Sequence, residues 1–246
     1  MGFIVTILAG GEGDCMRSAL PHVLNNFNGK PMLVYILEIV KKLSPDKINI
    51  IVGRHCKQTV DILQKYMCIF DINFLGYNNP GGTGHSVFGI LELIKNSDRI
   101  LILNGDMPLL CISIIQNLIQ KTNGYDGGIV VASLDNPTGY GRIIYDNDKL
   151  KSIVEEASCT EDEKKIEIVN AGIYLFTGEI LKKCVPDIKD NNSKNQFYFT
   201  DIIKILYDSN EYRITSVLLE PEENIFIRGV NTPEELAELE NLYNAL

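Results

Sequence analysis

The sequence predicts an α/β fold in which helices cover both faces of a mostly parallel sheet. From residue 3 to about residue 135, short apolar runs rich in β-branched residues alternate with segments of helical periodicity. The first run, residues 3–8, leads directly into Ala9-Gly10-Gly11, a glycine loop of the kind that follows a buried strand. Such alternation is typical of βαβ units with right-handed crossovers. With 246 residues, 45% of them apolar, the chain can bury the core that this fold needs.

The elements of the first half follow from their apolar spacing. Pro31 suits the first turn of a helix, and Leu33, Ile36, Leu37 and Val40 recur after it at helical intervals. The expected order is strand 3–8, helix 31–43, strand 47–52, helix 59–66, extended segment 68–75, helix 84–95, strand 99–103, helix 112–121 and strand 128–133.

After Pro137 the pattern loosens. Residues 142–145 and 150–154, separated by Asp146-Asn147-Asp148, predict a hairpin, and 168–176 an apolar strand. The charged residues 161–165 are expected in a solvated loop or at a helix end. Helices are expected over 199–207 and 234–246, with Thr232 as the cap of the second and acidic residues in its first turn. No internal repeat is evident, and nothing matches the hexapeptide repeats of a left-handed β-helix.

Charge and composition exclude several classes of protein. Lys and Arg number 23 against 32 Asp and Glu, a formal net charge of −9, so non-specific nucleic-acid binding is not expected. An anionic substrate would need a local cationic or metal-bearing site. The six cysteines are scattered, as in a protein with free thiols. No signal peptide or bilayer-spanning stretch is evident, which predicts a cytoplasmic protein without a membrane partner.

Three segments are expected beyond the carboxyl ends of parallel strands, where ligands bind in open α/β sheets. Leu8 to Gly13 is a glycine loop that can approach a phosphate closely, or is simply a tight turn. Gly81 to His85 can bind a base or phosphate through its backbone, or is a helix start capped by Thr83. In Asn104-Gly105-Asp106, the carboxylate is well placed for Mg²⁺, or it starts a turn before Pro108.

Further along, Pro137 to Arg142, Glu155 and Asn170-Ala171-Gly172 form a second group of candidate positions. Glu155 follows an apolar strand, where its carboxylate can accept hydrogen bonds from a polyhydroxyl ligand or simply meet solvent.

Taken in order, these segments resemble the sugar-1-phosphate nucleotidyltransferases, in particular the uridylyltransferase domain of bifunctional N-acetylglucosamine-1-phosphate uridylyltransferases. The resemblance runs through essentially the whole chain. It is carried by L-A-x-G-x-G from Leu8, S-x-L-P from Ser18, G-K-P-M from Gly29, G-T-G-H from Gly82, G-D-x-P-L from Gly105, P-T-G-Y-G-R from Pro137, V-E-E from Val154, N-A-G-I from Asn170, Y-x-T-D-I-I from Tyr198 and G-V-N from Gly229.

The resemblance implies a Rossmann-like nucleotidyltransferase fold of the glycosyltransferase-A-like kind, with a mixed, mostly parallel sheet and a smaller sugar-binding lobe. We expect a single domain over 1–246: a nucleotide-binding half over about 1–135, a sugar-binding half over about 136–231 and a C-terminal helix over 232–246. The trimeric acetyltransferase β-helix of the bifunctional relatives is missing from this sequence. The implied activity is therefore at most that of a monofunctional uridylyltransferase. The sequence leaves the oligomeric state open.

Roles for individual residues also follow from the resemblance. Leu8, Ala9, Gly10 and Gly11 are implied to meet UTP through backbone groups, and Gly82 and Thr83 to contact the uracil. Asp106, also implied as catalytic, and Asn231 are implied to hold Mg²⁺. The N-acetylglucosamine-1-phosphate is implied to bind at Gly141, Glu155, Asn170, Tyr198 and Thr200.

The sequence departs from the family pattern in the phosphate-binding loop. The family's G-x-G-T-R-M appears as Gly11-Glu12-Gly13-Asp14-Cys15-Met16, so that Cys15 replaces an arginine. His22 replaces the lysine of L-P-K, and Tyr77 stands where a glutamine contacts uracil.

A thiol has thus replaced one fixed cation, and an imidazole, charged only when protonated, has replaced the other. Because such transfers are catalysed mainly by positioning and charge neutralisation, we expect slow turnover unless another cation compensates. Arg17 is the first candidate, with His22 itself, Lys30, Arg142 and a second Mg²⁺ as others. The alternatives are a non-catalytic sugar-nucleotide binder or regulatory protein, and a nucleotidyltransferase of different base or sugar specificity.

Overall fold

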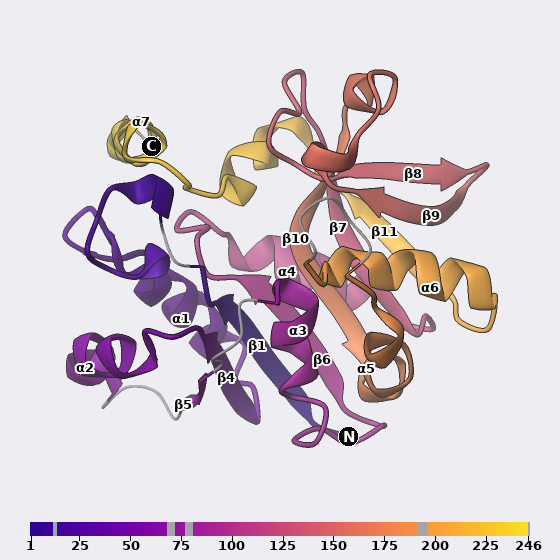
Figure 1. Cartoon of the computed structure of the whole chain (residues 1–246), viewed down its shortest axis with the longest axis horizontal. Helices are drawn as coiled ribbons and strands as arrows, with labels where there is room; N and C mark the ends of the chain where they lie inside the picture. The colour runs from indigo at the N-terminus through magenta and orange to yellow at the C-terminus, as the bar shows by residue number, and fades with distance from the viewer. Residues whose placement is uncertain (12–13, 68–71, 77–80, 191–195, 246) are drawn as a thin grey trace.

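Nine strands form one sheet in the computed structural model of this chain, which describes residues 1–11, 14–67, 72–76, 81–190 and 196–245. The central path through the sheet runs β11-β7-β10-β6-β1-β4-β5, and the hairpin β8–β9 joins it through β10. A separate two-stranded sheet is formed by β2 (Asn26–Phe27) and β3 (Lys30–Pro31). The predicted mixed, mostly parallel sheet flanked by helices is confirmed (Figure 1).

The first half alternates strands and helices as the apolar spacing predicts. Its strands and helices are β1 (Phe3–Ala9), α1 (Met32–Lys42), β4 (Lys47–Val52), α2 (Cys56–Met67), β5 (Ile72–Gly76), α3 (Thr83–Phe88), β6 (Arg99–Asn104), α4 (Ile112–Lys121) and β7 (Gly127–Ser133). The second half contains β8 (Arg142–Asp146), β9 (Lys149–Val154), β10 (Ile168–Thr177), α5 (Gly178–Cys184), α6 (Ile202–Ser209), β11 (Ile214–Leu218) and α7 (Pro233–Ala245). Short 3₁₀ helices punctuate the loops, among them η1 (Asp14–Met16), η2 (His22–Leu24), η6 (Phe199–Asp201) and η7 (Pro221–Ile227).

Strand direction changes at one place in the middle of the sheet. β1 is parallel to β4 and β6, and β11 is parallel to β7, whereas β10 runs antiparallel between β6 and β7. β10 follows a hairpin rather than a crossover helix, which is why its direction is reversed. As a result, the start of β10 meets the carboxyl end of β6, and the two strands supply polar residues to the same edge.

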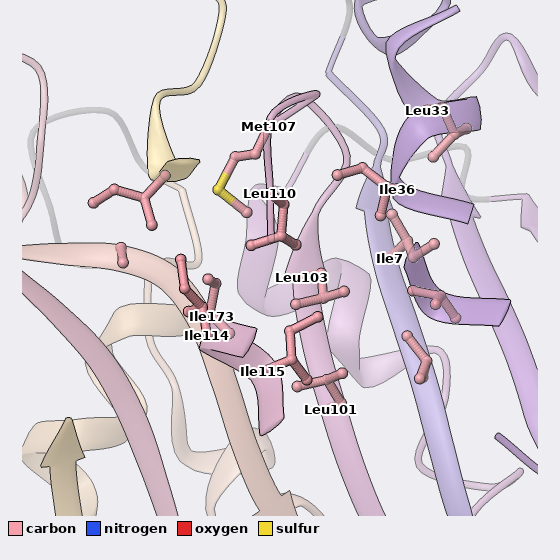
Figure 2. Close-up of a cluster of buried hydrophobic side chains, with 14 of the residues drawn as sticks. Ile7, Leu33, Ile36, Leu101, Leu103, Met107, Leu110, Ile114, Ile115 and Ile173 are labelled. Carbon is pink, nitrogen blue, oxygen red and sulfur yellow. The ribbon is translucent and has the colours of Figure 1, made fainter. Parts of the chain in front are cut away.

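Both faces of the sheet are buried, which explains the continuous apolar runs of its strands. On one face, Val5 and Ile7 of β1 pack with α1, α2 and α4; on the other, Ile4 packs in a cluster formed with α3, α5 and α6. Figure 2 shows the first cluster, with Ile7 next to Ile36 of α1 and Leu103 next to Leu110 and Ile115. α1 is thus held against the sheet by the apolar stripe predicted for it.

The helix predicted over 84–95 is wrong in its second half. α3 ends at Phe88, and Gly89 occupies the C-cap position. Beyond it, Ile90, Leu91 and Leu93 donate backbone hydrogen bonds to the residues three positions earlier, so the chain continues as 3₁₀-like turns. Glycine is a poor helix former, and Ile90, Leu91 and Ile94 remain buried in the turns that follow it.

Several elements were not predicted from the sequence, among them the short strands β2 and β3 and the longer elements α5 and β11. α5 begins immediately after β10, with Thr177 Oγ1 accepting a hydrogen bond from the Ile180 N–H at its start. β11 is a short edge strand whose β-branched run, Ile214 to Leu218, is a signal that sequence reasoning passed over.

Among the described residues, no helix combines the length and apolar character that crossing a bilayer requires.

Asp98 connects the beginnings of β1 and β6. Its carboxylate accepts hydrogen bonds from the backbone N–H groups of Gly2, at 2.8 Å, and Lys95, at 2.9 Å. These backbone hydrogen bonds, above all that from Lys95, hold the pKa of Asp98 below its usual value. Because the folded-state pKa is depressed, this stabilisation is present above the unfolded-state pKa and is lost as the pH falls through the folded-state value.

We expect Asp98→Asn to lower the free energy of unfolding at pH 7 by about 1–3 kcal/mol, the contribution typical of hydrogen bonds to a charged group. The difference from wild type should shrink below about pH 4, where the wild-type carboxyl also becomes protonated. Urea denaturation at several pH values measures it. Asp162→Asn, in an exposed ion pair, is the control and should change little. A loss that does not depend on pH would contradict the assignment.

Candidate functional site

A cleft of about 820 Å³ opens where the carboxyl ends of β1 and β6 meet the start of β10. The loop between β7 and β8 forms one wall, and the segment from η7 to the start of α7 forms another. The lining residues that carry the argument below are Leu8, Thr83, Asn104, Asp106, Asn136, Tyr140, Gly141, Glu155, Asn170, Gly172, Thr200, Arg228, Gly229, Asn231, Glu235 and Glu238.

The glycine loop after β1 lies close to two neighbouring segments. The Leu8 carbonyl accepts a hydrogen bond from the Gly105 N–H at 2.9 Å, which ties the ends of β1 and β6 together. A Cβ on Gly53 would lie 2.9 Å from the Gly10 carbonyl oxygen, so residue 53 must be small for the two loops to meet. Ala9 is buried and Gly11 exposed; Glu12 and Gly13 lie outside the described residues.

Asp106 is placed beyond the end of β6 with one carboxylate oxygen unsatisfied. Its Oδ1 is buried and has no hydrogen-bond partner in the described part of the chain, while Oδ2 lies 3.7 Å from His22 Nε2. Burial raises the pKa of Asp106, the neighbouring His22 lowers it and Glu235 raises it further. Since a buried unpaired acceptor is costly, this oxygen is expected to have a partner in the working protein.

His22 links this carboxylate to the far end of the chain. Its buried imidazole lies with Nε2 2.5 Å from the Val230 carbonyl oxygen, a contact across 208 positions. Because a carbonyl only accepts, Nε2 carries the proton. The Val230 N–H in turn donates to the Asp106 carbonyl at 3.1 Å. The segment Gly229–Asn231 is thereby held beside Asp106.

Asn231 lines the cleft at the start of α7. Its backbone N–H donates to Glu235 Oε2 at 2.6 Å, as does the Thr232 N–H at 3.2 Å. Thr232 Oγ1 accepts the Glu235 N–H at 3.1 Å, which completes a reciprocal capping box and confirms the predicted cap. The capping box fixes the backbone of Asn231 and brings the Glu235 carboxylate to the cleft.

The glycine run before α3 is joined to the segment before α6. Gly82 has a φ of 91°, the Gly84 N–H donates to the Phe197 carbonyl at 2.7 Å, and the Phe197 N–H donates to the Gly81 carbonyl at 2.7 Å. Thr83 Oγ1 accepts the Phe199 N–H at 3.0 Å. The expected alternative of Thr83 as helix cap is wrong, because Gly82 occupies that position. Tyr77 lies outside the described residues.

At the other end of the cleft, side chains from three elements meet. Thr200 Oγ1 donates to Glu155 Oε1 at 2.6 Å. Asn170 Nδ2 donates to the Tyr174 hydroxyl at 2.6 Å, and the Asn170 N–H donates to the Gly141 carbonyl at 2.9 Å. The structure thus brings Gly141, Glu155, Asn170 and Thr200 together.

Tyr198 is adjacent to this group but is not among the residues that line the cleft. Burial, followed by the nearby Glu155 charge, raises the pKa of Tyr198. The same two causes raise the pKa of Asp201. These shifts place both side chains within electrostatic range of the Glu155 carboxylate.

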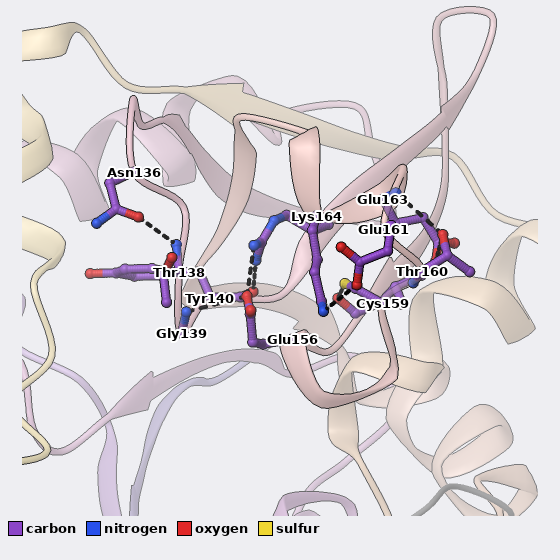
Figure 3. Close-up of polar contacts among 12 residues, drawn as sticks. Asn136, Thr138, Gly139, Tyr140, Glu156, Cys159, Thr160, Glu161, Glu163 and Lys164 are labelled. Atoms are coloured by element: carbon purple, nitrogen blue, oxygen red, sulfur yellow. Dashed lines mark hydrogen bonds and ion pairs between the residues drawn. The ribbon is translucent and has the colours of Figure 1, made fainter.

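The loop from Asn136 to Gly141 is anchored by Glu156, as Figure 3 shows. Glu156 Oε2 accepts the Gly139 N–H at 3.3 Å and lies 2.6 Å from Arg142 Nη2. Arg142, whose side chain is 1% exposed, also donates from Nη1 to the Tyr140 carbonyl. The guanidinium of Arg142 therefore helps to hold the loop that forms the cleft wall in its conformation.

The other cations considered from the sequence lie outside the cleft lining. Lys30 Nζ pairs with Glu38 at 2.6 Å and lies 4.0 Å from the centre of the Tyr35 ring. Arg17 has an exposed side chain 3.5 Å from Glu234 Oε1. Cys15 is exposed in η1.

Sequence reasoning placed Asn104 and Gly172 in candidate segments but missed three charged residues of the cleft lining. Asn104 packs against Gly172, whose φ of 72° and lack of a Cβ let the strands approach: a Cβ there would lie 2.4 Å from Asn104 Nδ2. Arg228, Glu235 and Glu238 flank the G-V-N segment and were not singled out. The sequence does carry a sign of them, because all three charged residues lie close to the G-V-N motif in the chain, although none of them belongs to the motif.

The comparisons with known proteins agree with this geometry. Residues 5–170 match the MobA-like NTP transferase domain. The chain belongs to this nucleotidyltransferase family. It is 39% identical over 243 residues to a probable UDP-N-acetylglucosamine pyrophosphorylase of Acanthamoeba polyphaga mimivirus, covering 97% of this chain and 95% of that protein. It is also 35% identical over 244 residues to the bifunctional protein GlmU of Francisella tularensis subsp. novicida, covering 99% of this chain and 52% of that protein.

This nucleotidyltransferase therefore spans about half the length of the bifunctional relatives it matches. Two solved structures share its fold at low identity. A UDP-glucose pyrophosphorylase complexed with UDP-glucose aligns with a TM-score of 0.77 and 16% identity over 100% of this chain and 99% of that one. HddC from Yersinia pseudotuberculosis complexed with GMP-PN aligns with a TM-score of 0.71 and 20% identity over 99% of this chain and 100% of that one.

We expect Gly82→Ala to destabilise this nucleotidyltransferase more than Gly124→Ala does. Both glycines have positive φ, at 91° and 82°, so both substitutions strain the backbone. At position 82 the added Cβ would also lie 2.6 Å from the Phe197 carbonyl oxygen, whereas at position 124 it meets nothing within 4 Å. Thermal unfolding of the two variants measures the difference. Equal melting temperatures would show that the contact with Phe197 does not constrain this loop.

Proposed function

We propose that this nucleotidyltransferase transfers UMP from UTP to N-acetylglucosamine-1-phosphate, giving UDP-N-acetylglucosamine and pyrophosphate. The observation that carries the proposal is the unsatisfied Asp106 Oδ1 at the end of β6, in a cleft whose other end gathers polar side chains from three elements. The 39% identity to a protein named a probable UDP-N-acetylglucosamine pyrophosphorylase supports the choice of base and sugar.

Mg²⁺ fits the metal-binding end of the cleft. Asp106 offers a carboxylate oxygen without a partner, and Asn231 carries an amide of the kind that Mg²⁺ accepts. Within the described part of the chain, no group of three or more His, Cys, Asp or Glu side chains could hold a metal. This matches Mg²⁺ sites that take one or two protein ligands and complete their shell with water and substrate phosphates. Bound there, the ion would supply charge neutralisation for the phosphates.

The nucleotide and the sugar are assigned to opposite parts of the cleft. The backbone of Leu8, Ala9, Gly10 and Gly11 would approach the phosphates, while Gly82 and Thr83, together with Tyr77, would meet the base. At the sugar end, we assign Gly141, Glu155, Asn170, Tyr198 and Thr200 to the N-acetylglucosamine moiety. Glu155 and Asn170 are already oriented by Thr200 and Tyr174, which favours hydrogen bonding to a polyhydroxyl ligand.

In the proposed reaction, a phosphate oxygen of the sugar-1-phosphate attacks the α-phosphorus of UTP. The bond from that phosphorus to the bridging oxygen breaks, and pyrophosphate leaves. The chain contributes by holding the two substrates in line, since proximity and orientation account for much of the rate in such transfers.

Turnover is expected to be slow, because Cys15 places no fixed charge on the phosphate loop and His22 is occupied by Val230. Arg17 retains an exposed guanidinium that can turn toward a phosphate.

A second candidate is a sugar-nucleotide binder without turnover. It is favoured by the acidity of the cleft, where Asp106, Glu155, Glu235 and Glu238 supply four carboxylates. Both candidates predict binding of UDP-N-acetylglucosamine, and they differ in whether pyrophosphate is released. A different base or sugar preference is the third outcome, which substrate panels distinguish.

We expect Mg²⁺-dependent pyrophosphate release from UTP with N-acetylglucosamine-1-phosphate, at a higher kcat/KM than with CTP, ATP or GTP, or with glucose-1-phosphate. Removal of the metal by EDTA should abolish it. Asp106→Asn should lower kcat by about 10³-fold or more, while the melting temperature without metal stays unchanged or rises, because a buried unpaired charge has been removed. Asp148→Asn, in the exposed β8–β9 turn, is the control. UDP-N-acetylglucosamine binding without any pyrophosphate release would establish the non-catalytic alternative.

We expect Cys15→Arg to raise kcat/KM at least about tenfold, because it places a fixed cation on the phosphate loop. Cys15→Gln, of similar length but neutral, separates the effect of charge from that of size. Steady-state pyrophosphate assays measure both variants. A flat or lower rate for Cys15→Arg would show that the loop does not lack a functional cation.

A further inference from the structure

Arg228 lies between η7 and the Gly229–Asn231 segment and lines the cleft. Its Nη1 donates to Glu238 Oε1 of α7 at 3.0 Å, and 31% of its side chain is exposed. This ion-paired hydrogen bond raises the pKa of Arg228, so the guanidinium is charged at any relevant pH. A guanidinium has five N–H donors, and this contact uses one of them. The side chain is therefore held in place with donors to spare.

The position of Arg228 brings it to the metal-binding end of the cleft. A Cβ on the next residue, Gly229, would lie 3.7 Å from both carboxylate oxygens of Asp106. Burial is the main cause of the raised pKa of the Tyr140 hydroxyl. The charge of Arg228 lowers this pKa, and the charge of Asp106 raises it. Arg228 and Asp106 thus act on the same hydroxyl from neighbouring positions.

The charges around the cleft make Arg228 distinctive. Among the described residues that line it, Asp106, Glu155, Glu235 and Glu238 are acidic, and Arg228 is the one lysine or arginine. The chain itself carries a net charge of −9. A polyphosphate entering this field is repelled unless cations inside the cleft offset the carboxylates. Arg142 and Lys30 are paired away from the cleft lining, and Cys15 carries no fixed cation.

We propose that Arg228 binds a phosphate group of a substrate in this cleft, with Glu238 orienting its guanidinium. The proposal rests on the proposed function, since it takes phosphate-bearing substrates for granted. The phosphate belongs either to UTP or to the sugar-1-phosphate. Arginine suits this role because its planar fork can bind phosphate through two parallel hydrogen bonds.

The test compares two variants that break the same ion pair. Arg228→Gln removes the cation, whereas Glu238→Gln removes its partner and leaves the cation in place. Two quantities are measured for each: the affinity for UTP by calorimetry with MgCl2, and the KM for N-acetylglucosamine-1-phosphate by pyrophosphate release. Arg228→Lys retains the charge without the fork, and Arg213→Gln, with an exposed side chain elsewhere, controls for net charge.

We expect Arg228→Gln to weaken binding of one substrate at least about tenfold, as expected for a lost charge-assisted hydrogen bond. Arg228→Lys should recover part of it. Glu238→Gln should lose clearly less affinity than Arg228→Gln, because the cation remains but is less well oriented, and Arg213→Gln should stay within about twofold of wild type. Weaker binding of UTP would show that Arg228 binds a phosphate of the nucleotide. A higher KM for N-acetylglucosamine-1-phosphate would show that it binds the phosphate of the sugar.

Two results overturn the proposal. Arg228→Gln can match wild type for both substrates, or Arg228→Gln and Glu238→Gln can lose affinity equally, which would make the ion pair merely structural. If wild type binds UTP and releases pyrophosphate in either of these cases, the proposed function stands and only the role of Arg228 fails. Absence of UTP binding by wild type overturns both.

Discussion

The site depends on a buried carboxylate oxygen that has no hydrogen-bond partner among the residues the structure describes. Asp106 follows the central strand β6, where parallel pairing with β1 and antiparallel pairing with β10 leave little freedom to the backbone. Its Oδ1 is closed off from solvent without a hydrogen bond, and the cleft around it adds further carboxylates. Such an arrangement is costly for the empty protein and favourable once a cation is present.

Long-range contacts assemble the rest of the site around this carboxylate. His22 reaches across the chain to the Val230 carbonyl, and Val230 in turn bonds to the backbone of Asp106. The backbone of Phe197 forms hydrogen bonds with Gly81 and Gly84, on either side of Gly82. Thr200 donates a hydrogen bond to Glu155. The register of β10 against β7 shifts between Asn170 and Tyr174, an irregularity of the kind often found at functional sites, and both residues line the cleft. Distant parts of the chain are therefore joined in two groups: His22, Asp106 and Val230 in one, and residues 81–84, 155 and 197–200 in the other.

Local pattern was enough to predict the elements whose apolar side chains repeat regularly. β4 has the bounds that its β-branched run predicts, and α4 covers the residues that its helical spacing predicts. The helix predicted over 84–95 ends early because Gly89 caps α3. The apolar run of the edge strand β11 is only five residues long, which was too short to be recognised as a strand. The placement of His22 could not be predicted, because its partner Val230 is 208 positions away and no local pattern connects them. Arg228 was overlooked for a related reason: only the folded chain shows which charges share a cleft.

Crystals of the protein soaked with MnCl2 and UTP, with the metal located from its anomalous scattering, test the central claim most directly. We expect the manganese ion to contact Asp106 Oδ1 and the side-chain oxygen of Asn231, with UTP phosphate oxygens completing its coordination. A manganese ion bound elsewhere in the cleft, with Asp106 Oδ1 still without a partner, would contradict the account.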